Sequence, residues 1–304
     1  MDIAIEVRDF RKLYGKLVAV DGISFQVRRG EIFGLLGPNG AGKTSTLECL
    51  EGLRTPDGGQ LRVMGVDPAR DASRLRNLIG VQLQSSGLPE SIRVDEAMRF
   101  FCAYHEVSPR FDLLERLELT GKLGAQYHTL SAGQQRRLAL ALAVAHRPPL
   151  VFLDEPTAGL DVASRVELHE LMLELKSQGT TFILATHDMA EAEKMADRVA
   201  ILLRGRIAAS GSPRELTATG AGMTKVVVRT ERSSLADCPS GFPAVSQSAF
   251  HEDYAIYFTS SPGPTVAALL AHIEAHGDSL IDLRVERPSL EERFLEITES
   301  GGVR

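Results

Sequence analysis

Hydrophobic residues form two kinds of pattern in the first two thirds of the chain: unbroken runs, and repeats at helical spacing. Continuous apolar runs predict buried strands of a parallel sheet, and they lie at residues 31–36, 150–153 and 180–185. Directly after the first run, Leu47, Leu50 and Leu53 recur at helical spacing. Strands and helices therefore alternate, which predicts an α/β fold.

Weaker patterns surround these runs. Short β-prone segments between turn residues predict an antiparallel N-terminal sheet, at residues 4–7, 17–20 and 23–27. Further strands are expected at residues 60–64, 78–83, 199–203 and 206–209, and an amphipathic helix at 188–196. From about residue 89 to 147 the sequence pattern is typical of helices, which are expected at 94–104, 110–119 and 134–145. This helical subdomain interrupts the α/β order.

The last quarter of the chain has its own strands and helices. It follows the small residues Thr219-Gly220-Ala221-Gly222. Strands are expected at residues 225–229, 254–259 and 280–285, with helices at 265–276 and after residue 288. Ser289 and Glu292 can form a capping box on the final helix. We therefore expect two domains, residues 1–220 and a small α+β domain at residues 225–304.

Charge and cysteine content exclude several classes of function. The 304 residues carry a net charge of −6, with no basic run, so nucleic acid is not an expected partner. The longest apolar stretch, residues 138–145, is far shorter than the roughly 20 residues that span a bilayer, and we expect a cytoplasmic protein. The isolated Cys49, Cys102 and Cys238 suggest neither a disulfide framework nor a zinc site.

A phosphate-binding loop follows the first apolar strand. The segment reads Gly37-Pro38-Asn39-Gly40-Ala41-Gly42-Lys43-Thr44-Ser45 and fits the pattern G-x-x-x-x-G-K-[ST]. Its strand and helix neighbours are those that the motif requires. Backbone N–H groups and the helix N-terminus can then face phosphate oxygens, Lys43 can reach the terminal phosphates, and Thr44 can offer its hydroxyl to Mg²⁺.

Acidic residues and a histidine follow the two other apolar strands. Asp154-Glu155 ends the run at 150–153, and His187 follows the run at 180–185. Ligands of parallel sheets collect at the carboxyl ends of strands, so Asp154 is placed to hold Mg²⁺ and Glu155 to orient or deprotonate water. Two acids at a strand end are often only solvated, and a lone histidine there is more often structural than catalytic.

The stretch Leu130-Ser131-Ala132-Gly133-Gln134 opens a helical run, and alone it would be a plain helix cap with a glycine turn. After a phosphate loop, and twenty residues before the strand at 150, it resembles the signature motif of ATP-binding-cassette (ABC) ATPases. Other motifs of that family match in order over about residues 3–220. They are the adenine-stacking aromatic Tyr14, Gln84 between the core and the helical subdomain, the dimer-crossing loop that ends at Asp161, and the switch histidine His187.

The resemblance implies that two cassettes close head to tail over two ATP molecules. Each site then combines one chain's phosphate loop with Ser131 and Gly133 of the other. Gln134 and Asp161 are further expected nucleotide-binding residues. Lys43 and the loop amides would hold the phosphates, His187 would contact the γ-phosphate, and Glu155 would act on water. The expected Mg²⁺ ligands are Thr44, Gln84 and Asp154. The signature departs from its commonest form at Ala132, where glycine is usual.

The C-terminal segment resembles the accessory domain of daunorubicin-resistance exporter ATPases. That resemblance implies a homodimer on the inner face of the cell membrane, serving a separate transmembrane permease. A drug, antibiotic or lipid-like molecule would be the exported cargo. The cargo itself cannot be read from this chain, because the residues that select it lie in the permease.

Other functions known for ABC ATPases fit this sequence less well than export does. Chromosome-associated members need a long coiled coil between the phosphate loop and the signature, and Lys43 and Ser131 are only 88 positions apart. Translation-type members carry two cassettes in one chain, and this chain has one. An importer subunit stays open, since only the C-terminal domain argues against it. A nucleotide-binding scaffold without turnover is opposed by the intact catalytic positions.

Overall fold

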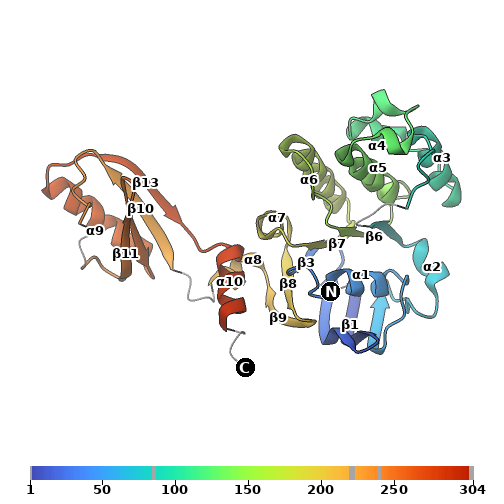
Figure 1. The fold of residues 1–304 in the computed structure, drawn as a ribbon, viewed down its shortest axis with the longest axis horizontal. Coiled ribbons are helices and arrows are strands. Elements are labelled where there is room, and N and C mark those ends of the chain that lie inside the picture. Colours follow the sequence, from blue (N-terminus) through green and yellow to red (C-terminus); the bar gives the residue numbers. More distant parts are fainter. Residues whose placement is uncertain (1, 84–86, 219–222, 238–240, 301–304) are drawn as a thin grey trace. The chain divides into compact units, whose positions relative to one another are not determined.

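The computed structural model describes residues 2–83, 87–218, 223–237 and 241–300. The chain divides into two compact units, Met1–Pro213 and Arg214–Arg304. The first unit holds a mainly parallel sheet with helices, and the second holds an antiparallel sheet with helices (Figure 1). The predicted join at residues 219–222 lies outside the described residues.

A six-stranded sheet forms the centre of the first unit. Its order is β5 (Ile79–Gln82), β6 (Leu150–Asp154), β7 (Thr181–Thr186), β3 (Ile32–Leu36), β8 (Arg198–Leu203) and β9 (Arg206–Gly211). The first five are parallel and β9 closes antiparallel on β8. Every residue of β3, β6 and β7 is buried, as their unbroken apolar runs predict.

A second sheet is antiparallel, as expected, in the order β2 (Leu17–Arg28), β1 (Ile3–Tyr14) and β4 (Gly58–Val63). The two β-prone segments predicted at 17–20 and 23–27 are one continuous strand. Gly22 has a φ of 69°, and the pairing of β1 with β2 shifts register nearby, so an irregularity replaces the predicted turn.

Alternate residues of the central strands pack on opposite faces. Leu150 and Phe152 join a core with the antiparallel sheet and α1 (Lys43–Leu50), whereas Val151 and Leu153 join a core with the helical block. That block holds α3 (Val94–Tyr104), α4 (Phe111–Arg116), the 3₁₀ turns Thr120–Lys122 and Tyr127–Thr129, and α5 (Ala132–Val144). The remaining helices of this unit are α2 (Ala72–Arg76), α6 (Val162–Ser177) and α7 (Met189–Met195). Figure 1 shows the antiparallel sheet and α1 on one side of the central sheet and the helical block on the other.

The second unit is built on an antiparallel sheet in the order β11 (Val245–His251), β12 (Tyr254–Thr259), β10 (Thr224–Thr230) and β13 (Leu280–Glu286). Helix α9 (Pro262–Ala275) shares its core through Leu269 and Ile273. Two further helices are α8 (Pro213–Ala218) and α10 (Leu290–Ser300). The predicted capping box is confirmed, because Ser289 and Glu292 exchange hydrogen bonds of 3.2 Å. In the part of the chain that the structure describes, no helix is long and apolar enough to cross a membrane.

Candidate nucleotide site

The phosphate loop joins β3 to α1 through tightly packed glycines. A Cβ at Gly37 would lie 2.3 Å from the carbonyl oxygen of Leu202, and a Cβ at Gly42 would lie 2.5 Å from that of Ala19. Gly42, the residue before α1, also has a φ of 104°. Because these positions exclude any side chain, the loop presents its backbone at the start of the helix.

Lys43 is buried against this loop. Its Nζ donates to the carbonyl oxygens of Gly37 and Pro38, at 2.6 and 3.2 Å, and lies 3.8 Å from Glu155 Oε1. Burial lowers the pKa of the Lys43 amine, while the charges of Glu155 and Asp154 oppose that change. The predicted phosphate-directed cation therefore lies beside the two acids that follow β6.

Asp154 has the donor chemistry of a hard-cation ligand. Its Oδ2 accepts a hydrogen bond of 3.0 Å from Thr44 Oγ1, and its buried Oδ1 has no hydrogen-bond partner among the described residues. Burial raises the pKa of this carboxyl group. A carboxylate oxygen beside a hydroxyl oxygen suits Mg²⁺. Gln84, the third predicted ligand, lies outside the described residues.

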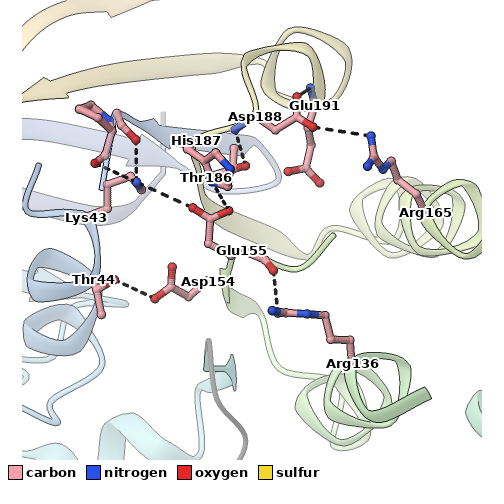
Figure 2. Close-up of polar contacts among 12 residues, drawn as sticks. Lys43, Thr44, Arg136, Asp154, Glu155, Arg165, Thr186, His187, Asp188 and Glu191 are labelled. Carbon is pink, nitrogen blue, oxygen red and sulfur yellow. Dashed lines mark hydrogen bonds and ion pairs between the residues drawn. The ribbon is translucent and has the colours of Figure 1, made fainter. Parts of the chain in front are cut away.

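Glu155 bridges two other predicted site residues, as Figure 2 shows. Its Oε2 lies 2.8 Å from His187 Nδ1, and its Oε1 faces the Lys43 amine. Glu155 also has a φ of 50°, which is uncommon for a residue with a side chain. His187 follows β7 and stays more than half exposed, so one side of its ring faces the carboxylate and the rest is open to a ligand.

A cavity of about 370 Å³ lies at the phosphate loop, and His187 is not among its described lining residues. Tyr14, all of residues 38–45, Asp154 and Glu155 contribute to its wall. Tyr14 is about one third exposed and its hydroxyl lies 3.3 Å from Ser45 Oγ, so the aromatic ring stands beside the loop. Cations from Lys12 and Arg54 lie over that ring, each 5.4 Å from its centre.

The signature residues lie elsewhere in the chain. Within the described residues, the wall of this cavity includes none of Ser131, Gly133, Gln134 and Asp161. Ser131 caps α5 and exchanges hydrogen bonds with Gln134, whose side chain is therefore part of a capping box. Asp161 caps α6 through the backbone N–H of Ser164, at 2.8 Å. The exposed Ser131 remains able to donate its hydroxyl hydrogen.

Known proteins match the chain over most of its length. The family model described as "ABC transporter" matches residues 20–158. Nod factor export ATP-binding protein I of Cupriavidus metallidurans is 36% identical, over 98% of each chain. The chain belongs to the ABC transporter family.

Two further comparisons agree with this membership. Daunorubicin resistance ATP-binding protein DrrA3 of Streptomyces coeruleorubidus is 33% identical, over 98% of this chain and 96% of its own. A solved ATP-binding subunit of an ABC transporter is 29% identical with a TM-score of 0.66, over 70% of this chain and 91% of its own. The ATP-binding domains of this family hydrolyse ATP, so the chain is the ATPase subunit of an ABC transporter.

This ABC ATPase also has a second, apolar cavity of about 480 Å³. Its walls come from β5, α3 and α5, and from the end of α1. Among its lining residues, Gln82 is almost fully buried with both amide atoms lacking a hydrogen-bond partner among the described residues. Glu51 has one carboxylate oxygen in the same condition. No motif in the sequence pointed to these buried polar groups.

Glu51→Gln is expected to stabilise the protein at neutral and alkaline pH. Burial, and secondarily the charges of Asp154 and Glu48, raise the pKa of Glu51 from 4.5 to about 8. The folded state therefore holds this proton more tightly, and stability falls as pH rises from about 4.5 to 8. At about 1.4 kcal/mol per pKa unit, the cost above pH 8 is roughly 5 kcal/mol at most.

Thermal unfolding measured across this pH range tests the prediction. Glu51→Gln should flatten the loss of stability, whereas Glu170→Gln, at an exposed acid on α6 that pairs with Arg116, should keep the parental slope. Equal slopes in Glu51→Gln and the parent protein would contradict the assignment.

Proposed function

We propose that this chain powers export, hydrolysing ATP with Mg²⁺ to drive a separate permease that expels a drug, antibiotic or lipid-like molecule. The observation that supports export is the share of this chain that its exporter-named relatives match. Proteins named for Nod factor export and for daunorubicin resistance match 98% of the chain, so the match includes the C-terminal unit as well as the cassette. An importer subunit would need to share only the cassette.

The phosphate loop and its neighbours fit the polyphosphate of ATP. The loop amides and the N-terminus of α1 bind the phosphates, and Lys43 exchanges its carbonyl contacts for phosphate oxygens. Tyr14 stacks on the base from the side of the cavity. Thr44 and Asp154 hold Mg²⁺, with Gln84 as a third ligand. When bound, the ion neutralises charge on the phosphate oxygens.

Glu155 and His187 act on the attacking water and the terminal phosphate. The Glu155 carboxylate is fixed between a lysine and a histidine, which holds an acceptor oxygen in one place for a proton of the water. His187 binds the γ-phosphate with its exposed side. Phosphoryl transfer depends mainly on such positioning and charge stabilisation.

A second copy of the chain completes each site. Ser131 and Gly133 stand at the N-terminus of α5, where backbone N–H groups favour an anion, yet they are not among the lining residues described for their own chain's nucleotide cavity. A head-to-tail homodimer brings them, with Gln134 and Asp161, to the ATP of the partner. Each chain then needs the other for hydrolysis.

The apolar cavity supports contact with the permease. Leu53, Phe100 and Tyr104 line it and are each more than half exposed, which is unusual for large apolar side chains that cluster. An amphipathic segment of a membrane subunit can cover them, and the chain would then lie on the inner face of the membrane. None of these three residues is among the described lining residues of the nucleotide cavity.

Transport by inverted membrane vesicles tests the proposed direction. Vesicles that contain this chain and its proposed permease should accumulate a fluorescent anthracycline or another tested cargo when ATP is added outside. Vesicles with Lys43→Ala should not. ATP-driven uptake in the opposite orientation, in right-side-out vesicles loaded with ATP, would instead identify an importer.

A further inference from the structure

Arg136 joins the signature helix to the backbone of Glu155. Its Nη1 donates a hydrogen bond of 2.7 Å to the Glu155 carbonyl oxygen, at a partly buried position. Figure 2 shows the side chain extending from α5 toward Glu155. The same oxygen accepts a longer bond, of 3.3 Å, from the backbone N–H of Ala158. Arg136 therefore ties α5 to the turn that follows β6.

Glu155 needs this kind of support. Its φ of 50° lies in the left-handed region, which residues with side chains hold only where the surroundings fix it. The Glu155 N–H donates to the Ala185 carbonyl oxygen at 2.9 Å, so both backbone polar groups are fixed by neighbouring elements. The direction of the carboxylate toward His187 depends on this backbone.

The same face of α5 carries Gly133, three residues before Arg136. A Cβ at Gly133 would lie 3.4 Å from the side chain of Leu160, so α5 also packs closely on the loop that leads to Asp161. Residues three apart on a helix share a face and move together. The helix end that carries Ser131 is therefore connected through Arg136 to the acid at the reaction centre.

We propose that Arg136 is a positioning residue for ATP hydrolysis. It holds the Glu155 carboxylate in a fixed position relative to the N-terminal end of α5, which carries the signature residues. The inference rests on the proposed role of Glu155. A charged donor suits this task, because charge-assisted hydrogen bonds are stronger than neutral ones. The adjacent Arg137 has a different role, since it is buried and pairs with Glu118 and Glu167.

Steady-state ATP hydrolysis by the full chain tests the proposal. Arg136→Met keeps most of the apolar stem and removes the donor. It should lower kcat about tenfold, with the KM for ATP and the thermal unfolding midpoint close to parental. Arg136→Lys should recover part of kcat. The control is Arg147→Met, at an exposed arginine just beyond the same helix, which should behave as the parent.

Chemical rescue separates positioning from a general structural effect. Millimolar guanidinium chloride should raise the kcat of Arg136→Ala, whereas equal sodium chloride should not, and guanidinium should not rescue Arg137→Ala. Parental kcat in Arg136→Met would overturn the proposal. So would a loss confined to KM or unfolding temperature, or a kcat defect that neither lysine nor guanidinium relieves. A parent protein without ATPase activity would instead contradict the proposed function.

Discussion

Glu155→Gln is expected to lower ATP hydrolysis by about a hundredfold or more while ATP binding stays near parental. The amide keeps the shape of the side chain and can still accept from His187, but it cannot take a proton from water. ATP-bound dimers should accumulate, because the step that separates them is blocked. Phosphate release, ATP affinity and size-exclusion chromatography with ATP measure the three effects.

The matched control is Glu170→Gln, at an exposed acid on α6 that forms a surface ion pair with Arg116. It should hydrolyse ATP at the parental rate. Near-normal phosphate release by Glu155→Gln would remove Glu155 from the role of base. The Lys43–Glu155–His187 contacts would then be structural.

The central part of the site could be predicted from the sequence because its residues follow apolar runs. Ends of parallel strands share one edge of a sheet, so residues after β3, β6 and β7 were expected to meet. The structure brings them together, with Thr44 3.0 Å from Asp154 and Glu155 2.8 Å from His187. Their roles in catalysis stay predictions.

Contacts between distant elements could not be predicted in the same way. Arg136 and Arg137 are neighbours in one helical run, and only the packing of α5 sends one to the Glu155 backbone and the other to two acids. Gln134 is a different case. The pattern Ser131-x-x-Gln134 is itself a capping-box signal, and the structure uses it as one.

Several elements were missed, including the short helices α2 and α8. Two of the longer ones, β11 and α6, were missed because their local patterns are weak. Strand β11 is a sheet edge, and almost all of its residues are exposed, so it lacks the apolar alternation of a half-buried strand. Helix α6 carries exposed Val162 and Leu173 as well as buried Leu168 and Met172. Apolar residues on several faces obscure its period. In both cases tertiary packing decides what the sequence leaves ambiguous.

Ser131→Arg is expected to abolish hydrolysis without affecting the binding of ATP to a single chain. Ser131 is exposed at the N-terminus of α5 and is not among the described lining residues of its own nucleotide cavity, so the added bulk should block only a partner's γ-phosphate. Lys43→Ala should instead weaken ATP binding about tenfold or more, because it removes a buried cation from the phosphate loop. ATP affinity measured on dilute protein distinguishes the two defects.

Combining these two inactive variants tests whether sites are shared between chains. In a mixed dimer, one site joins an intact Lys43 to an intact Ser131, and the other site carries both lesions. Co-expression with two different tags yields the mixed dimer, which should regain about half of the parental activity because one of its two sites is whole. Each variant alone should stay inactive. If every site were built within one chain, each chain of the mixed dimer would keep its own lesion, and no activity would return.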